Sequence, residues 1–547
     1  MSLVRLHNVS KKYDSKMIFH DVFFRLNKGD KVGLIGKNGV GKTTILKLIL
    51  NQEEPTSGTV EIEKDIRIGY FSQFSELNGE MTIQQVLEDV FSDIRAIEKE
   101  LSEIEIELKK APKGKQLQQL IDKQSQLLEE MEHRDGWTYQ TRINTVLNVL
   151  GFSDVYRNRP IDQLSGGWRN RSALAKILLE EPDILLMDEP TNFLDISGIE
   201  WLEEWFKKLR GALIIVSHDR HFLDLVVNRI VEIENYHFQE YEGNFTQYIR
   251  EKRIRIKTLE HQFQHEEELL AYESEAIADR NEMKKDPSKA LKSKLAKIKK
   301  RIEPRPVDKI ITDLYYGIRV GNKLCRIEVI SKAYDGKTLF RNVSMDIGRG
   351  DRIAIIGPNG CGKTTLLRIL TGGELSDTGE IDWEKNVECS YYNQVLEELD
   401  LNDSSTHTLN VTSLGYSAQR KHVNRFLSLM QFSEMDIEQK IRTLSGGQRA
   451  RVALAKCLLS GASVIVLDEP TNHLDLTSTQ VMERALVHFP GAVVVASHDR
   501  FFIDKIATRL LIFEDSDKLR EFNGNWTLYQ ASIENPELME IPTEKDQ

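Results

Sequence analysis

The sequence of 547 residues has few cysteines and no long apolar run, and each of these absences excludes a class of protein. No stretch approaches the roughly 18 consecutive apolar residues that cross a bilayer. The first ten residues, MSLVRLHNVS, lack the apolar core of a secretory signal. The four cysteines all lie in the second half of the chain without a CxxC pair, which excludes a disulfide framework, an iron–sulfur cluster and a structural zinc site. We therefore expect a reduced, cytoplasmic protein with no membrane partner.

The charge of the chain is acidic on average but unevenly distributed. The formal net charge is −11, from 74 Lys and Arg against 85 Asp and Glu, and this average alone argues against a nucleic-acid partner. Between Arg280 and Arg305, however, 11 residues are basic and only three are acidic. Such a segment is either a solvated face or a site for phosphate backbones, and its single sign over a short stretch favours phosphate-backbone binding.

An internal repeat sets the domain organisation. GKNGVGKTT at Gly36–Thr44 returns as GPNGCGKTT at Gly357–Thr365, and LSGGW at 164–168 returns as LSGGQ at 444–448. The two LSGG motifs lie closer together along the chain than the two glycine-rich motifs do, so the first copy carries extra residues between them. We predict two copies of one domain, at residues 1–249 and 309–547, with an insertion in the first copy and a linker over residues 250–308.

Each copy has the sequence pattern of an α/β fold. Short apolar runs, KVGLIG and RIAIIG, lead into glycine-rich turns that are followed by amphipathic helices. DILLMDEP, SVIVLDEP, ALIIVSHD and AVVVASHD are apolar runs typical of buried strands. Apolar strands that alternate with helices predict a mostly parallel sheet with both faces covered, in which ligands bind at the carboxyl ends of the strands.

The insertion, about residues 82–139, has helical periodicity. Two series of apolar residues, from Ile83 to Leu108 and from Leu117 to Met131, are spaced mostly by three and four. This spacing predicts an antiparallel helical hairpin with helices about 40 Å long at 1.5 Å per residue. The hairpin either stiffens its own domain or forms an arm that reaches a partner, and lysines near its tip favour the arm.

The linker has a similar pattern. Two further apolar series flank the turn KKDPS, where Pro287 prevents the first helix from continuing. We predict a second helical hairpin, whose turn and return helix carry the basic excess.

The repeated GxxxxGK[ST] motif is a phosphate-binding loop. Its glycines allow backbone N–H groups to surround the β-phosphate, and Lys42 and Lys363 reach the β- and γ-phosphate oxygens. Thr43 and Thr364 offer a hydroxyl to Mg²⁺, and the helix N-terminus that follows favours an anion. Two matches, each after an apolar strand and before a helix, make this the most specific feature of the sequence.

Carboxylates, amides and histidines near other strand ends complete a set for phosphoryl transfer. Each DEP motif places an aspartate at a strand end and a glutamate directly after it, so that one acid can serve the metal while the other aligns the attacking water. A histidine after the next apolar strand is placed to hold the γ-phosphate. The predicted metal ligands are Thr43, Gln73 and Asp188 in the first copy and Thr364, Gln394 and Asp468 in the second. The predicted catalytic residues are Glu189, His218, Glu469 and His498.

The LSGG motifs and two tyrosines complete the predicted nucleotide sites. Each LSGG begins a helix, so it is a second anion-binding end in a copy that already has a phosphate loop. We therefore predict that the two copies pair head to tail, each LSGG closing over the other copy's nucleotide. Tyr13 and Tyr334 precede their phosphate loops by the same distance along the sequence and either stack on adenine or face the core. The predicted nucleotide-binding residues are Tyr13, Gly36, Asn38, Gly39, Gly41, Lys42, Thr43, Thr44, Gln73, Ser165, Gly166 and Gly167 in the first copy, and Tyr334, Gly357, Asn359, Gly360, Gly362, Lys363, Thr364, Thr365, Gln394, Ser445, Gly446, Gly447 and Gln448 in the second.

These motifs, in this order and twice, resemble the ATP-binding cassette (ABC) superfamily over nearly the whole chain: phosphate loop, glutamine loop, LSGGQ, DEPTNxLD and SHD. Two cassettes without a membrane segment, an inserted arm and a charged helical linker resemble the ABC-F subfamily in particular. The resemblance implies an α/β protein of two tandem P-loop ATP-binding cassette domains, with an inserted helical-hairpin arm and a helical-hairpin interdomain linker. It also implies ATP and Mg²⁺ as cofactors and an ATPase that produces ADP and phosphate.

The resemblance further implies a partner and a role. The ABC-F pattern implies binding at the ribosomal E site and ATP-gated action on the P-site tRNA and the peptidyl-transferase centre, as a translation factor or as a ribosome-protection factor in antibiotic resistance. The basic linker and the arm would contact rRNA and tRNA, and the chain would be a monomer with paired cassettes and no transmembrane subunit. A soluble ABC ATPase that acts on DNA, or as a nucleotide-gated scaffold, is the alternative. Trp168 stands where the family has glutamine, so the two sites need not turn over equally.

Overall fold

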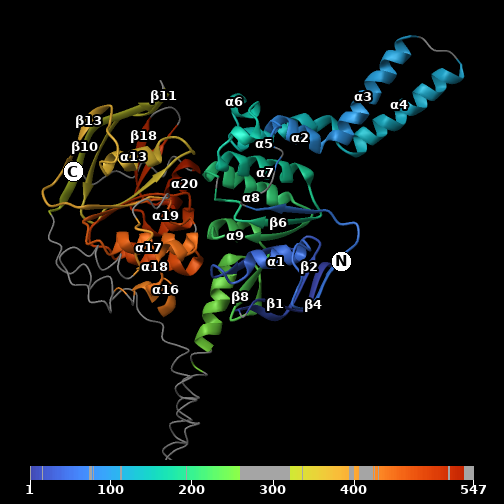
Figure 1. The fold of residues 1–547 in the computed structure, drawn as a ribbon. Coiled ribbons are helices and arrows are strands. Elements are labelled where there is room, and N and C mark those ends of the chain that lie inside the picture. The colour runs from blue at the N-terminus through green and yellow to red at the C-terminus, as the bar shows by residue number, and fades with distance from the viewer. Residues whose placement is uncertain are drawn as a thin grey trace, which may run out of the picture. The chain divides into compact units, whose positions relative to one another are not determined.

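The computed structural model describes residues 2–14, 16–72, 77, 79–110, 114–192, 194–258, 261, 321–334, 337–393, 399–405, 423, 426–428, 430, 432–472, 474–514 and 518–534. The chain divides into two compact units, Met1–Glu240 and Tyr241–Gln547, which repeat one arrangement of strands and helices (Figure 1). Of the predicted linker, residues 250–258 are helical, whereas its turn and its return helix lie outside the described residues.

The first unit contains a small antiparallel sheet and a larger, mostly parallel sheet. The small sheet has the order β2-β1-β4, and the larger one has the order β5-β6-β7-β3-β8-β9. Strands β5, β6, β7, β3 and β8 are parallel to their neighbours in that order. The strands are β1 Ser2–Tyr13, β2 Lys16–Asn27, β3 Lys31–Gly36, β4 Ser57–Ile62, β5 Ile68–Phe71, β6 Ile184–Asp188, β7 Ala212–Val216, β8 Arg229–Glu234 and β9 His237–Glu242.

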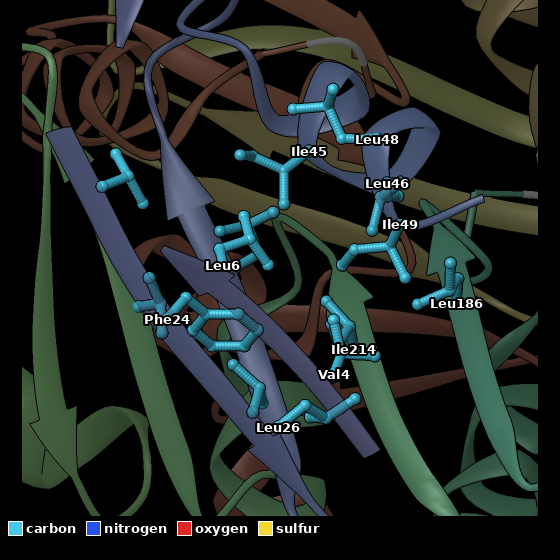
Figure 2. Close-up of a cluster of buried hydrophobic side chains, with 14 of the residues drawn as sticks. Val4, Leu6, Phe24, Leu26, Ile45, Leu46, Leu48, Ile49, Leu186 and Ile214 are labelled. Atoms are coloured by element: carbon cyan, nitrogen blue, oxygen red, sulfur yellow. The ribbon is translucent and has the colours of Figure 1, made fainter. Parts of the chain in front are cut away.

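The core of the first unit lies between its two sheets and helix α1 (Lys42–Ile49). Every residue of β7 is buried, which explains its uninterrupted apolar sequence ALIIV. Figure 2 shows side chains of β1 and β2, such as Leu6 and Phe24, close to Ile45 of α1 and Ile214 of β7. Because this core holds α1 directly behind the end of β3, it also fixes the glycine-rich loop that joins them.

Besides α1 and the helices of the insertion, the first unit has helices that connect the strands of the larger sheet. They are α5 Tyr139–Val149, α6 Asp154–Arg157, α7 Gly166–Glu180, α8 Ile196–Lys208 and α9 Arg220–Val226. Both α8 and α9 begin at an aspartate, Asp195 and Asp219, whose side chain accepts a hydrogen bond from the first turn.

The insertion forms an antiparallel pair of helices, α3 (Ser92–Lys109) and α4 (Lys115–His133), that projects from the first unit (Figure 1). Ion pairs join Glu100 to Lys123 at 2.9 Å and Asp93 to Arg134 at 3.6 Å, and both are consistent with opposite chain directions. With 18 and 19 residues, each helix is about 28 Å long at 1.5 Å per residue. The expected length of about 40 Å was therefore too great.

The predicted first arm helix was too long because the apolar series beginning at Ile83 belongs to two helices. Helix α2 (Ile83–Val90) ends at Phe91, where α3 begins. Val86 of α2 packs with Ile161 and Leu164 in a small buried cluster, so α2 belongs to the body of the unit. Helix α3 forms the first half of the arm. The heptad spacing continues across the break and hides it.

The second unit repeats the two sheets of the first. The small sheet has the order β11-β10-β13, and the larger one has the order β14-β15-β16-β12-β17-β18. Its strands are β10 Lys323–Tyr334, β11 Lys337–Gly348, β12 Arg352–Ile356, β13 Thr378–Trp383, β14 Cys389–Tyr392, β15 Val464–Asp468, β16 Ala492–Ala496, β17 Arg509–Phe513 and β18 Leu519–Asn523. Its helices with described bounds are α13 Lys363–Leu370, α16 Glu434–Glu438, α17 Gly446–Leu458, α18 Leu476–Val487, α19 Arg500–Ile506 and α20 Trp526–Glu534.

The predicted fold class, an α/β protein with two tandem copies of one parallel-sheet domain, is confirmed. Within the described part of the chain, no helix has both the length and the apolar character required to span a bilayer.

Candidate functional site

The two glycine-rich loops join the end of a central strand to the start of a helix, β3 to α1 and β12 to α13. Gly41 and Gly362 have φ angles of 109° and 114°, in the left-handed region. A Cβ atom at Gly41 would lie 2.3 Å from Cγ2 of Ile18, and one at Gly362 would lie 3.2 Å from Cβ of Leu339. Glycine is therefore required for both the backbone conformation and the close approach of the neighbouring strand.

The lysine of each loop points back into the loop. Nζ of Lys42 donates hydrogen bonds to the carbonyl oxygens of Gly36 at 2.8 Å and Lys37 at 3.2 Å. Nζ of Lys363 donates to the same positions in the second copy, Gly357 at 2.8 Å and Pro358 at 3.0 Å. Each ammonium group is thus held inside the loop that would surround a phosphate.

A threonine and an aspartate meet at the mouth of each loop. Oγ1 of Thr43 donates a hydrogen bond to Oδ2 of Asp188 at 2.9 Å, although the two residues are 145 positions apart. Burial raises the pKa of Asp188, and the hydrogen bond from Thr43 and the charge of Lys42 oppose that shift. In the second copy burial likewise raises the pKa of Asp468, against a hydrogen bond from Thr364.

These paired oxygens fit a magnesium ion. A hydroxyl and a carboxylate brought together are the hard ligands that Mg²⁺ accepts, usually in company with water and nucleotide phosphates. A bound cation would also offset the unfavourable burial of the aspartate charge. Thr43 with Asp188, and Thr364 with Asp468, are therefore the residues that would hold the ion.

The glutamate after each aspartate contacts the predicted histidine. Oε1 of Glu189 lies 3.3 Å from Nε2 of His218, and Oε1 of Glu469 lies 3.3 Å from Nε2 of His498. Each glutamate also accepts a hydrogen bond from the backbone N–H of that histidine, at 3.4 and 3.3 Å. In the second copy, Nε2 of His498 lies 3.2 Å from Oδ1 of Asn359 in the phosphate loop.

Both glutamates are held in an unusual environment. Glu189 and Glu469 have φ angles of 53° and 47°, a strained region for a residue with a side chain. Their side chains are only 20% and 14% exposed. Burial is the largest cause of a raised pKa at both residues, and it raises the pKa of Glu469 to about 8. A carboxylate with a raised pKa is a stronger base once it is ionised, and this suits it to accept a proton from water.

The two LSGG helices begin differently. In α17 the side chain of Ser445 accepts a hydrogen bond from the backbone N–H of Gln448, and the side chain of Gln448 accepts one from the backbone N–H of Ser445. This reciprocal capping box fixes the start of the helix. In α7 the side chain of Ser165 makes no capping hydrogen bond, and Trp168, at the position of the glutamine, has no side-chain acceptor for the reciprocal bond.

Trp168 packs against aromatic side chains that precede α7. Its ring is stacked on Tyr156 with centroids 4.4 Å apart, and lies 4.9 Å from the ring of Phe152. The guanidinium of Arg171 lies over the indole at 4.8 Å from its centroid. In the first copy, aromatic packing therefore holds the helix start that a capping box holds in the second.

Within each unit, the predicted residues of the phosphate loop, the DEP motif and the SHD motif lie close together, and those of the LSGG motif lie at the start of a separate helix. Asn38, Gly39, Thr44, Gly360 and Thr365 lie in the loops or in the first turns of α1 and α13, and Gly166, Gly167, Gly446 and Gly447 lie in the first turns of α7 and α17. Gln73 and Gln394 lie outside the described residues. Tyr13 and Tyr334 are 41% and 45% exposed, which excludes the core-facing alternative.

Glu53 and Glu374 bind these tyrosines and occupy matching positions of the repeat, yet neither was among the predicted residues.

Comparisons with known proteins agree with this geometry. A family model described as ABC transporter matches residues 19–192 and 340–472, and a second model with the same description matches residues 231–311. ABC transporter F family member 5 of Arabidopsis thaliana is 33% identical over 96% of this chain and 77% of that protein. The energy-dependent translational throttle protein EttA of Escherichia coli is 31% identical over 96% of this chain and 94% of that protein.

A solved structure shares the fold. The archaeal ribosome recycling factor aABCE1, in complex with the archaeal stalk protein aP1, matches with a TM-score of 0.63 over 96% of this chain and 92% of that chain. At 19% identity, this likeness shows the fold alone.

Two parallel-sheet units, each with a phosphate loop, a DEP motif at a strand end and an LSGG helix, define an ATP-hydrolysing protein with tandem ATP-binding cassettes. The two relatives described above carry the F family name and the name EttA. The chain belongs to the ABC-F subfamily of the ABC superfamily.

Proposed function

We propose that this ABC-F protein is a ribosome-associated ATPase of translation, whose ATP state gates its action on the P-site tRNA and the peptidyl-transferase centre from the E site. The observation that carries the proposal is the match to the translational throttle protein EttA along nearly the full length of both chains. The basic segment between Arg280 and Arg305 supplies the charge that an RNA partner requires. The proposal places the protein in the cytoplasm, as a monomer whose cassettes pair across two nucleotides.

Within each cassette the named side chains have separable tasks. Lys42 and Lys363, held in their loops, bind the β- and γ-phosphate oxygens of ATP. When bound, Mg²⁺ neutralises charge on the phosphates and orients them. Glu189 and Glu469 accept the proton of the attacking water, and the adjacent histidine holds the carboxylate in place.

Sedimentation with ribosomes tests this proposal. The double variant Glu189→Gln plus Glu469→Gln retains the shape of the site but removes the proton acceptor, so it should bind ATP, fail to hydrolyse it and accumulate on ribosomes. We expect ATP-dependent, RNase-sensitive cosedimentation that exceeds that of the wild type. The matched control is Lys42→Ala plus Lys363→Ala, which should not bind ATP and should stay in the soluble fraction.

The same experiment distinguishes the translation role from the alternative role on DNA. If the glutamine double variant stays off ribosomes and binds duplex DNA in the presence of ATP, the protein acts on DNA and the translation role is wrong. Neutralising the lysines of residues 280–305 to glutamine separates the two tasks of the chain: we expect ribosome binding to fall while basal ATP hydrolysis is unchanged.

A further inference from the structure

Each cassette contains a cluster of three side chains at the end of its first strand. The hydroxyl of Tyr13 donates a hydrogen bond to Oε2 of Glu53. Nζ of Lys11 lies 3.1 Å from the same oxygen and 5.0 Å from the centroid of the Tyr13 ring, over one face. Lys11 also donates a hydrogen bond to the backbone carbonyl of Glu54 at 2.8 Å. The lysine thus ties β1 to the segment that follows α1.

The second cassette repeats these contacts, and Lys332 also lies 3.2 Å from Oδ1 of Asp377, where the first cassette has Thr56. The hydroxyl of Tyr334 donates to Oε1 of Glu374, and Nζ of Lys332 lies 3.2 Å from that oxygen. Lys332 lies over the Tyr334 ring at 5.2 Å from its centroid and donates to the backbone carbonyl of Leu375 at 2.8 Å. All three residues stand at the same positions of the repeat as their counterparts in the first cassette. The recurrence of this geometry in two units that have diverged elsewhere indicates that the cluster is part of the repeated unit and not an incidental ion pair.

The cluster lies beside the phosphate loop. Tyr13 pairs with Lys16 at the hairpin end of β1 and β2, and Ile18, two residues further along β2, closely approaches Gly41 of the loop. In the second cassette, Tyr334 pairs with Lys337, and Leu339 closely approaches Gly362. The lysine side chains are 12% exposed, whereas the two tyrosines are 41% and 45% exposed. The ring is therefore open to a ligand while its supports are enclosed.

We propose that Glu53 with Lys11, and Glu374 with Lys332, are positioning residues that hold Tyr13 and Tyr334 in the orientation in which adenine stacks on them. This inference rests on the prediction from the sequence that adenine stacks on the two tyrosines, which we call the adenine platforms. The carboxylate fixes the hydroxyl end of the ring. The ammonium group covers one face, so a base stacks on the other, and its charge draws electron density toward the covered face.

A ring that is already immobilised loses less conformational entropy when ATP binds. Fixing one free side chain on binding weakens affinity by roughly two- to tenfold. Loss of the anchor should therefore raise the Kd and the KM for ATP by that factor. It should leave kcat within twofold, since neither glutamate touches the phosphates.

The test compares three full-length proteins altered in both cassettes together. Tyr13→Phe with Tyr334→Phe keeps the rings and removes the hydroxyl that the carboxylate holds, and Glu53→Ala with Glu374→Ala removes the carboxylate. Each should raise the Kd for ATP, measured by calorimetric titration, by roughly two- to tenfold. The four-residue combination should be no worse than either pair, because both changes break the same contact.

Two control variants separate this inference from the assignment of the tyrosines as the residues on which adenine stacks. Glu54→Ala with Leu375→Ala alters the next residue in each cassette but keeps the carbonyl groups that the lysines bind, and it should leave the Kd unchanged. Tyr13→Ala with Tyr334→Ala removes the ring and should weaken ATP binding more than the phenylalanine pair does. One outcome overturns the anchoring inference but keeps the assignment of the tyrosines to adenine. In it, Tyr13→Ala with Tyr334→Ala weakens ATP binding, whereas the tyrosine-to-phenylalanine pair and the pair Glu53→Ala with Glu374→Ala bind ATP like the wild type. If all variants bind like the wild type, the platform assignment itself is wrong, and the inference falls with it.

Discussion

Replacing Glu469 by glutamine should stabilise the nucleotide-free protein, and the gain should grow with pH. Burial raises the pKa of Glu469 from 4.5 to about 8. Between these two values the folded state keeps a proton that the unfolded state has already lost, so the free energy of unfolding falls as pH rises. At 1.36 kcal/mol per pKa unit, the loss is about 5 kcal/mol, complete above pH 8 and absent below pH 4.5. Glutamine is neutral at every pH, so Glu469→Gln does not suffer this loss.

Calorimetric unfolding of the full-length protein at pH 5, 7 and 9 measures the effect. For a unit of this size, a few kcal/mol corresponds to a Tm increase of about 10 °C, which should be present at pH 9 and nearly absent at pH 5. Glu189→Gln should act in the same direction on the first cassette, so the two variants also assign the transitions. Glu384→Gln, at an exposed position of the second cassette, is the control and should have no pH-dependent effect. A gain of the same size at pH 5 and pH 9 would refute the argument from burial.

Two further predictions follow from the helix starts and the phosphate loops. Trp168→Ala removes two aromatic contacts and a cation–π contact, about 2–4 kcal/mol together, so hydrogen exchange at the start of α7 should accelerate at least tenfold. Trp168→Gln should accelerate it less, because a capping box like that of Gln448 becomes possible, and equal exchange in Trp168→Ala and wild type would contradict this role. Alkylation of Cys361, inside the second phosphate loop, should remove ATP binding at one of the two sites, and bound ATP should protect the thiol. The control is Cys361→Val, which has the residue type of Val40 in the first loop and should resist the reagent. Labelling that ignores ATP and leaves turnover unchanged would count against the loop assignment.

The sequence predicts those parts of the site whose geometry follows from topology. Parallel strands end at one edge of a sheet, so an aspartate at the end of β6 had to lie near the loop after β3. The hydrogen bond between Thr43 and Asp188 realises this expectation across 145 positions of sequence. The meeting of Glu189 with His218 follows in the same way from the adjacent ends of β6 and β7.

Features that depend on side-chain packing were not predictable from the pattern. The break at Phe91 is invisible because the heptad spacing continues through it, and only the packing of α2 on the body of the cassette reveals it. The left-handed backbone of Glu189 is a tertiary constraint with no local signal, since glutamate does not favour that region. The aromatic partners of Trp168 are Phe152 and Tyr156, and no periodicity connects them to the LSGG motif.

The stacked indole of Trp168 gives the first cassette a natural optical label. It is one of six tryptophans in the chain, and it lies against a tyrosine ring and beneath a guanidinium group. Indole emission responds to a nearby positive charge and to ring contact, so a shift of α7 against α6 changes its intensity. The corresponding position of the second cassette is a glutamine, which does not fluoresce. In a variant that keeps Trp168 and replaces the other five tryptophans, events at the LSGG helix of the first cassette can therefore be followed by intrinsic emission, without attaching a dye.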